Sequence, residues 1–329
     1  MSPDSSPPRA FVLLIPVWND WESLRLLLDD IDAHWPAARG TAHVLVVDDG
    51  STARLPVDWA DPCYPNLAGV DILYLRRNLG HQRAIAVGLS HIESHLPCDG
   101  ILIMDGDGED SPRYLGPLLA KFAEEGGKKV VFAQRARRSE GPVFALFYWI
   151  FRTVHWALTG LKVQFGNFSV LPYAGLRALV VVPALWNHYA ASVVRSRLPY
   201  TLVPTERAQR YHGASKMNFV SLVTHGLSAI SVFGEVVGIR LLIANLVIVI
   251  AILLGLLVTV LIRLATDLAI PGWASYVSGI MVVMLFQMVS MSILTVFTIL
   301  HRRNAMPFLP IRDFVFFIDR KLTLFVHGP

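Results

Sequence analysis

The sequence predicts an α/β protein with a doubly wound parallel sheet, followed by two helices that cross a membrane as a hairpin. Five short apolar runs in the first half of the chain alternate with helix-like stretches, which is the pattern of a parallel sheet covered by helices. Two long uncharged runs follow residue 240. The composition agrees, because 53% of the 329 residues are hydrophobic and only 16% are charged, too few for an ordinary soluble domain.

The apolar runs are the predicted strands. They cover residues 11–17, 43–49, 71–75, 100–105 and 129–133. Residues 20–34 and 81–95, which lie between them, are predicted as helices. Ligands of such sheets bind at the carboxyl ends of the strands. The residues directly after each run are therefore the candidates for a functional site.

Two segments are predicted to span a membrane. Residues 241–262 and 274–300 carry no charge, and each is close to or above the roughly 20 residues that cross a bilayer as a helix. Two uncharged runs of this length disfavour burial in a soluble core. Basic residues flank the hairpin on its outer sides, at Arg210, Lys216, Arg240, Arg302, Arg303 and Arg312. The positive-inside rule then places both ends of the chain in the cytoplasm.

Four other segments are less defined. Residues 219–240 and 144–161 are apolar stretches broken by polar groups, and each fits either an interfacial helix or an amphipathic helix packed on the globular domain. The tail, residues 301–329, alternates aromatic and charged residues and is expected to be cytoplasmic, either interfacial or partner-facing. Residues 1–10 are expected to be disordered, and they lack the basic start and apolar core of a signal peptide.

The net charge and the cysteine content indicate the cellular environment of the globular part. A net charge of +4 suits an acidic membrane surface or an anionic ligand, and it does not choose between them. Cys63 and Cys98 are too few and too far apart in sequence for a disulfide framework or a metal knuckle. A reducing cytosol is the expected compartment.

Polar residues follow four of the predicted strands. They are the segments from Pro16 to Asp20, Asp48 to Ser51, Arg76 to Arg83 and Asp105 to Asp110. A bare turn explains Asp48-Asp49-Gly50-Ser51 as well as a ligand site does, because tight turns favour Asp and Gly. Acids at this edge could also accept hydrogen bonds from a base or a ribose.

Asp105 and Asp107 form the most informative pair. Two carboxylates one residue apart at a strand end can both reach one hard divalent cation that bridges a diphosphate. A solvated acidic loop is the alternative for an isolated D-x-D. The position after an all-apolar strand, with Glu109 and Asp110 following, favours the cation site.

These segments, in this order, resemble the family 2 glycosyltransferases of GT-A fold, and more narrowly the polyprenyl-phosphate sugar synthases, which include dolichyl-phosphate mannose synthase. The resemblance covers Phe11 to about Asn218, and the membrane hairpin behind it resembles that of the bacterial members. It implies a GT-A catalytic domain over residues 11–218. It also implies a multi-pass protein of the inner membrane whose catalytic domain is cytoplasmic.

The resemblance implies a nucleotide site and a metal site. Asp105 to Asp110 match the pattern D-A-D-x-Q-D, with Glu109 in place of Gln, and Mg²⁺ or Mn²⁺ is implied on Asp105, Asp107 and Glu109. Asp20 replaces the usual Glu, and the segment from Arg77 to Gly88 resembles R-N-x-G-x-x-x-A-x-x-x-G. The residues implied for the nucleotide are Pro16, Trp18, Asp20, Asp48, Asp49, Asn78, Gly80 and Gly106.

The resemblance also implies a basic cluster for the phosphates of donor and acceptor. Gln134-Arg135 with Arg138 resembles the arginine-bearing segment after the fifth strand, and Arg210 to Lys216 match R-x-x-G-x-S-K. Binding of lipid headgroups is the alternative role for this second group. The implied catalytic residues are Asp105, Asp107, Arg135, Arg210, Ser215 and Lys216. One departure from the family is that Asn167 and Ser169 stand where many relatives have an acid and a base.

The implied reaction is the inverting transfer of a hexose from a nucleotide sugar, UDP-linked rather than GDP-linked, to polyprenyl phosphate. The product would serve lipopolysaccharide or cell-wall glycan biosynthesis, and the resemblance suggests a homotetramer. Two alternatives stay open: a processive polysaccharide synthase, which usually needs more spanning helices and a Q-x-x-R-W element, and a non-catalytic scaffold that binds nucleotide or lipid. Nucleic acid is not expected as a partner, because the basic residues gather near the membrane segments instead of forming a stripe.

Overall fold

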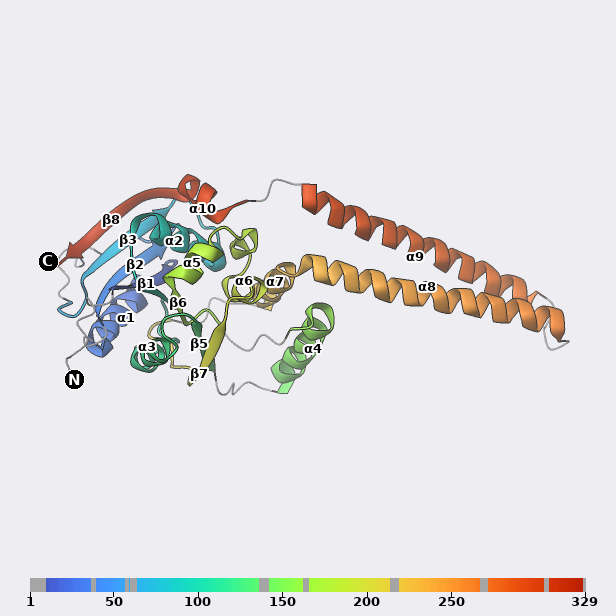
Figure 1. Cartoon of the computed structure of the whole chain (residues 1–329), viewed down its shortest axis with the longest axis horizontal. Helices are drawn as coiled ribbons and strands as arrows, with labels where there is room; N and C mark the ends of the chain where they lie inside the picture. Colours follow the sequence, from blue (N-terminus) through green and yellow to red (C-terminus); the bar gives the residue numbers. More distant parts are fainter. Residues whose placement is uncertain are drawn as a thin grey trace. The chain divides into compact units, whose positions relative to one another are not determined.

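The computed structural model describes residues 10–36, 40–56, 59, 64–135, 142–161, 166–213, 219–266, 272–304 and 308–327. They form two compact units (Figure 1). The first unit is drawn from residues 1–146, 163–232 and 307–329, and the second from residues 147–162 and 233–306. Ser215 and Lys216 lie outside the described residues, as do Cys63 and Arg138.

The first unit is built on a mixed sheet with the strand order β7-β5-β6-β4-β1-β2-β3-β8. The strands are β1 (Ala10–Val17), β2 (Thr41–Asp48), β3 (Gly69–Leu75), β4 (Gly100–Ile103), β5 (Val130–Arg135), β6 (Ser169–Pro172), β7 (Tyr200–Thr205) and β8 (Ile318–Val326). The predicted strands β1 to β4 pair in parallel, which confirms that part of the expectation. The sheet is not wholly parallel, because β6 and β8 run antiparallel to their neighbours.

Helices cover both faces of this sheet. The helices of the first unit include α1 (Trp21–His34), α2 (His81–His95), α3 (Leu115–Glu124), α5 (Tyr173–Leu179), α6 (Tyr189–Arg195) and α7 (Phe219–Ser231). Alternate residues of β1 belong to different cores: Leu13 and Ile15 pack with α1 and α3, whereas Val12 and Leu14 pack with α2, α5 and α6. The fold is therefore doubly wound, as predicted (Figure 1).

Helix α2 lies unusually close to the sheet. A Cβ atom on Gly88 would lie 2.3 Å from Leu14 Cδ1 and 2.9 Å from Val47 Cγ2. Only glycine permits this approach of the middle of α2 to β1 and β2. The start of α2 reaches the carboxyl end of β2, where Leu79 N and Gly80 N donate to Asp49.

The tail returns to the first unit and completes the sheet. Helix α10 (Pro310–Asp313) and a 3-10 turn at Phe314–Phe317 lead into β8, which pairs antiparallel with β3. Arg76 N donates to Phe317 O at 2.9 Å, and Arg76 Nε donates to Ile318 O at 3.0 Å. The sequence alone does not predict this strand, because three charged residues in a row, Asp319, Arg320 and Lys321, interrupt any apolar pattern and are typical of an exposed edge.

The second unit contains α8 (Gly234–Ala265) and α9 (Trp273–Asn304), each long and apolar enough to cross a membrane. They pack antiparallel: Gly238 lies against Ile299, and Gly255 lies against Met281. Asn245 Nδ2 on α8 donates to Met288 O at 2.8 Å and to Ser292 Oγ at 2.6 Å on α9. Only 6% of the most apolar stretch of α8, and none of that of α9, is buried within the protein, which excludes the role of a buried core helix.

Helix α4 (Pro142–Thr159) lies mostly in the second unit and is tied to α8. Arg240 Nη1 donates to Ala157 O at 2.8 Å and to Trp156 O at 3.3 Å, so this cation satisfies carbonyls at the end of α4. The side chains of Trp149 and Trp156 are more than half exposed. Exposed Trp is typical of a membrane interface, which is one of the two roles expected for this stretch.

Candidate active site

The carboxyl ends of β1, β2, β3 and β4 lie at one edge of the sheet, because these strands are parallel neighbours. The loops that follow them carry the predicted nucleotide and metal residues. Asn19 joins two of these loops. Its Oδ1 accepts hydrogen bonds from Thr52 N at 2.8 Å and Ala53 N at 2.9 Å, and its own N donates to Ser51 Oγ at 2.7 Å. Asn19 has φ of 50°, which is uncommon outside glycine and marks a constrained position.

The two neighbouring acids Asp48 and Asp49 have different roles. Asp49 Oδ1 accepts from Leu79 N at 2.7 Å, and Asp49 Oδ2 accepts from Gly80 N at 2.9 Å, so this carboxylate holds the start of α2. Asp48 Oδ1 accepts from Ser51 N at 3.0 Å and supports its own turn. Burial raises the pKa of both carboxyl groups, and each residue is 3% exposed. Asp48 is therefore the better placed of the two to face a ligand.

The acid loop, residues 105–110, is fixed by its own side chains. Asp110 Oδ2 accepts from Asp105 N at 3.1 Å, and Asp107 Oδ1 accepts from Glu109 N at 3.0 Å. A Cβ atom on Gly106 would lie 3.1 Å from Pro16 O, so the loop lies directly against the end of β1. This brings the predicted metal residues next to the predicted nucleotide residues.

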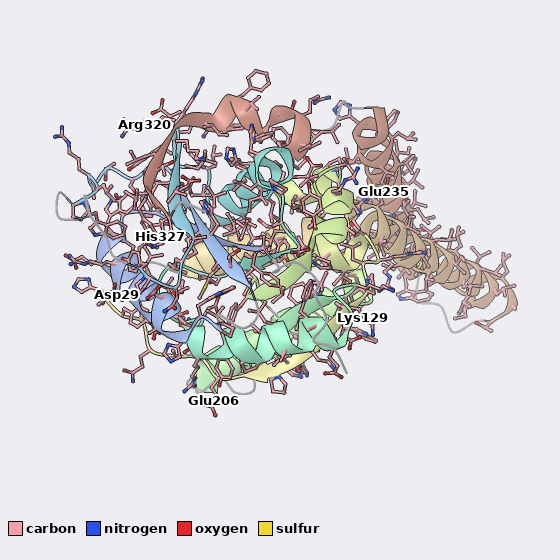
Figure 2. The ribbon with its side chains drawn as sticks, turned by 60° about the vertical axis from the view of Figure 1, so that its left-hand side comes forward. Asp29, Lys129, Glu206, Glu235, Arg320 and His327 are labelled. Atoms are coloured by element: carbon pink, nitrogen blue, oxygen red, sulfur yellow. The ribbon has the colours of Figure 1, made fainter. Side chains whose placement is uncertain are left out.

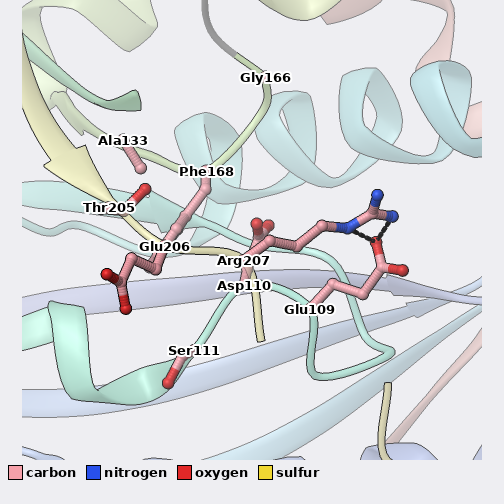
Figure 3. Close-up of a pocket in the computed structure, with 9 residues that line it drawn as sticks. All are labelled: Glu109, Asp110, Ser111, Ala133, Gly166, Phe168, Thr205, Glu206 and Arg207. Carbon is pink, nitrogen blue, oxygen red and sulfur yellow. Dashed lines mark hydrogen bonds and ion pairs between the residues drawn. The ribbon is translucent and has the colours of Figure 1, made fainter. Parts of the chain in front are cut away.

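Three acids of this loop each face a cation. Arg210 Nη1 lies 3.2 Å from Asp107 Oδ2, and the same guanidinium pairs with Asp20. His81 Nε2 lies 3.1 Å from Asp105 Oδ1, and Arg207 pairs with Glu109 (Figure 3). These contacts compensate the mutual repulsion of the carboxylates.

The pKa values follow from this arrangement. Burial raises the pKa of Asp107, and the neighbouring Asp105 raises it further, against the opposing effect of Arg210. Loss of hydration would lower the pKa of His81, but the charge and hydrogen bond of Asp105 outweigh it, so the pKa of His81 is raised. The loop therefore attracts positive charge strongly.

The segment from Glu206 to Gly213 lies along the acid loop. Tyr211 N donates to Asp107 O at 3.1 Å, and Ala208 N donates to Glu109 O at 3.1 Å. The Tyr211 ring covers Gly108, whose φ is +85°, and a Cβ atom there would lie 2.1 Å from Tyr211 Cδ2. This segment therefore places Arg210 beside the D-x-D pair.

The departure at Asn167 and Ser169 is part of a polar network. Asn167 Nδ2 lies 2.9 Å from His81 Nε2, and Asn167 Oδ1 accepts from Gln82 Nε2 at 3.2 Å. Ser169 Oγ lies 2.8 Å from Tyr189 OH. Asn167 therefore contacts the histidine that faces Asp105, which ties this position to the acid loop.

A small hollow opens beside the acid loop, between it and the ends of β5 and β7. It is lined by Glu109, Asp110, Ser111, Ala133, Gly166, Phe168, Thr205, Glu206 and Arg207 (Figure 3). Polar and apolar groups both line it, and the ion pair of Arg207 with Glu109 is part of the lining. Its lining joins the acid loop to the strands on the β5 side of the sheet.

The other predicted residues fall into two groups. Asn78 and Gly80 lie at the carboxyl edge of the sheet, where the candidate site is, and Trp18 is 44% exposed there. Arg135 ends β5 opposite Thr205, but its side chain lies outside the described part of the chain, and Ser215 and Lys216 lie outside it altogether. Sequence reasoning missed the roles of His81, Arg207 and Tyr211, although Arg207 and Tyr211 stand within four residues of the predicted Arg210.

The chemistry of the acid loop fits a divalent metal. Within the described ranges, no three Asp, Glu, His or Cys side chains converge on one point as a closed metal cage. Asp105 and Asp107 offer two hard oxygen ligands, and Mg²⁺ commonly takes few protein ligands and completes its shell with phosphate and water. The two carboxylates therefore fit a metal that would also bind a diphosphate. Glu109 as a third ligand stays a prediction, since its carboxylate pairs with Arg207.

Comparisons with known proteins identify the class of enzyme. Residues 12–174 match the family model described as glycosyl transferase family 2, so the chain carries a glycosyltransferase domain of that kind. An undecaprenyl-phosphate 4-deoxy-4-formamido-L-arabinose transferase of Klebsiella pneumoniae is 27% identical over 300 residues, covering 82% of this chain and 80% of that protein. The enzyme of the same name from Edwardsiella ictaluri is 26% identical over 252 residues, covering 68% and 71%.

A solved structure shows the same fold. Glucosyl-3-phosphoglycerate synthase from Mycobacterium tuberculosis, in complex with Mn²⁺, UDP-glucose and phosphoglyceric acid, superposes with a TM-score of 0.50 at 15% identity. The match covers 70% of this chain and 80% of that one. The predicted GT-A fold is thereby confirmed. The family model and the named relatives show that the chain is a glycosyltransferase.

Proposed function

We propose that this glycosyltransferase moves a sugar from a nucleotide sugar, UDP-linked, to the phosphate of a polyprenyl phosphate such as undecaprenyl phosphate, with inversion at the anomeric carbon. The observation that carries the proposal is the acid loop facing Arg210 at the carboxyl edge of the sheet, in a chain with an exposed apolar hairpin. The named relatives, which use undecaprenyl phosphate by their names, support the acceptor.

The donor diphosphate belongs at the acid loop. Asp105 and Asp107 would hold Mg²⁺ or Mn²⁺, which supplies positive charge to the leaving diphosphate when it is bound. The similar synthase was solved in complex with Mn²⁺ and UDP-glucose, which supports a metal and a UDP donor here. Arg210 already faces this loop, and its guanidinium can donate to phosphate oxygens as it does to carboxylates.

The bond changes need little proton transfer. An oxygen of the acceptor phosphate forms a bond to the anomeric carbon, the bond from that carbon to the diphosphate breaks, and the electron pair leaves with the diphosphate. A phosphate monoester has a second pKa near 6, so the nucleophile is anionic at neutral pH. The task of the protein is therefore to orient both phosphates and compensate the charge that develops.

The hairpin of α8 and α9 would anchor the catalytic unit, which is the first unit with its acid loop, at the inner membrane, where the lipid acceptor lies. Its apolar surface is of the kind that lipid covers. The basic flanks favour a catalytic unit and chain ends on the cytoplasmic side. The exposed aromatic residues of α4, Trp149 and Trp156, are suited to the headgroup layer and to the isoprenoid of the acceptor.

The proposal is tested with the full chain purified in detergent. Radiolabelled UDP-hexoses, GDP-hexoses and UDP-linked 4-deoxy-4-formamido-L-arabinose are offered with undecaprenyl phosphate, with Mn²⁺ or with EDTA. We expect metal-dependent label in the lipid phase from a UDP sugar. Asp107→Ala should abolish transfer, while Glu124→Gln, a carboxylate change on the exposed face of α3, should leave it unchanged. Lipid-phase label that persists in Asp107→Ala would contradict the metal assignment, and no label from any donor would contradict the proposed reaction.

A further inference from the structure

Three side chains stand in one row across the carboxyl end of the sheet. Asp48 on β2 is paired in register with Tyr74 on β3, and Tyr74 is paired with Arg320 on β8. Residues directly opposed across strands point to the same face of a sheet. The row therefore brings a cation from the last strand of the chain to the same face as an acid predicted to bind the nucleotide. Figure 2 labels Arg320 on this edge strand.

Arg320 contacts the row directly. Its guanidinium carbon lies 4.5 Å from the centre of the Tyr74 ring, within the range of a cation–π interaction. Burial raises the pKa of Tyr74, and its neighbours Asp48 and Arg320 act on it with opposite signs. Arg320 also opposes the rise in the pKa of Asp48 that burial causes. The three groups are thus within electrostatic reach of one another.

The strand that carries Arg320 is held firmly from the opposite face. Lys321 Nζ lies 2.8 Å from Asp71 Oδ2, and Thr323 Oγ1 donates to Asp71 Oδ1 at 2.6 Å. Burial would raise the pKa of Asp71, but hydrogen bonds from His43, Lys321 and Thr323 outweigh it and hold the pKa well below its usual range. The pairing with β3 shifts register between Tyr74 and Leu75, next to Arg320, and such irregularities re-aim side chains.

The pair of Asp48 and Arg320 matches the edge of particular nucleobases. A carboxylate accepts a hydrogen bond from a ring N–H, and a guanidinium donates to a carbonyl oxygen. Uracil and guanine each present a ring N–H beside a carbonyl, whereas cytosine and adenine have no ring N–H on that edge. We propose that Arg320 is a nucleobase-binding residue of the donor site, acting beside Asp48 and selecting a base with an N–H next to a carbonyl. This inference rests on the proposed nucleotide-sugar donor.

The test is isothermal titration calorimetry of UDP, GDP and CDP with the detergent-purified full chain and Mn²⁺. The variants are Arg320→Ala and Arg320→Lys, which keeps a charge but loses the planar fork. Arg177→Ala, an exposed arginine on α5, is the matched control for charge, and Lys321→Ala is the control for the strand. Thermal unfolding of each variant reports whether the fold is kept.

We expect the wild type to bind UDP or GDP more tightly than CDP. Arg320→Ala should weaken binding of the preferred nucleotide about tenfold, which corresponds to the loss of one hydrogen bond to a charged group, and should leave binding of CDP unchanged. The affinity of Arg320→Lys for the preferred nucleotide should lie between those of the wild type and Arg320→Ala. Both control variants should keep the preference over CDP. Equal weakening of UDP and CDP, or no weakening at all, overturns the base assignment while the proposed function stands. Failure of the wild type to bind any of these nucleotides overturns both.

Discussion

Arg210 and Asp107 are joined by an ion pair of 3.2 Å between Nη1 and Oδ2, although 103 positions separate them in the chain. The same guanidinium pairs with Asp20 in the loop between β1 and α1, so one side chain connects two loops at the carboxyl edge of the sheet. Only a planar fork with several donors can serve both carboxylates at once. Arg210 therefore orders the loop that is proposed to receive the diphosphate.

Arg210→Lys should lower turnover about 100-fold or more, because an ammonium group retains the charge but not the second contact. The measurement is the rate of sugar transfer at saturating donor. Arg113→Lys is the matched control, since Arg113 forms a comparable 3.2 Å pair with the exposed Glu206. Equal rates for Arg210→Lys and the control would show that the fork of Arg210 is not used.

The central strands could be predicted from the sequence, whereas the outer ones could not. β1 and β2 are nearly continuous apolar runs, because both of their faces are buried. β6 has four residues, β7 contains Pro204, and β8 has three charged residues in a row. These segments become strands through partners far away in the chain, and no local pattern encodes such pairing.

The candidate site could likewise be predicted only in part from the sequence. The D-x-D pair follows an apolar strand, so its place at the carboxyl edge follows from the topology. The adjacent Asp48 and Asp49 look alike in sequence, and only the positions of Leu79 N and Gly80 N distinguish them. The contact of Asn167 with His81 depends on how β6 meets α2, which a single sequence does not reveal.

Asp49→Asn should destabilise the catalytic unit without removing a nucleotide contact. Both carboxylate oxygens accept backbone N–H groups, and an amide can offer only one acceptor oxygen. One buried N–H then loses its partner, which costs about 1–3 kcal/mol. Urea unfolding followed by Trp fluorescence measures the change. Glu124→Gln on the surface should shift the midpoint little, and a shift as small for Asp49→Asn would contradict the assigned role.

Asn245→Leu should weaken the hairpin. Asn245 donates to Met288 O and Ser292 Oγ across the two helices, and polar contacts of this kind in membranes contribute about 0.6–2 kcal/mol. Thr259→Val is the matched control, because the Thr259 hydroxyl donates only to Gly255 O of its own helix at 2.9 Å. Thermal unfolding in detergent should show a lower midpoint for Asn245→Leu than for the control, and equal midpoints would contradict the role of Asn245.

His91 should make the stability of the catalytic unit depend on pH. It is 7% exposed, neither ring nitrogen has a hydrogen-bond partner within the described chain, and its ring stacks on His95 with centroids 4.4 Å apart. Burial lowers its pKa from 6.5 to about 4, and His95 and Lys321 act in the same direction, against Asp71. The unfolded chain therefore binds this proton more readily than the folded chain between pH 6.5 and pH 4.

The sign follows from that difference. As the pH falls from 6.5 toward 4, the unfolded state gains the proton first, so the free energy of unfolding decreases by up to about 1.4 kcal/mol per pH unit. His91→Leu removes the group and should flatten this part of the curve, while its stability at pH 7.5 stays equal to or above that of the wild type, because a buried ring without hydrogen bonds is replaced by an apolar side chain. Unfolding curves recorded at half-unit intervals from pH 4 to 7.5 give both slopes. All other titratable groups are shared by the two proteins, so parallel curves would show that His91 is not the source of the dependence.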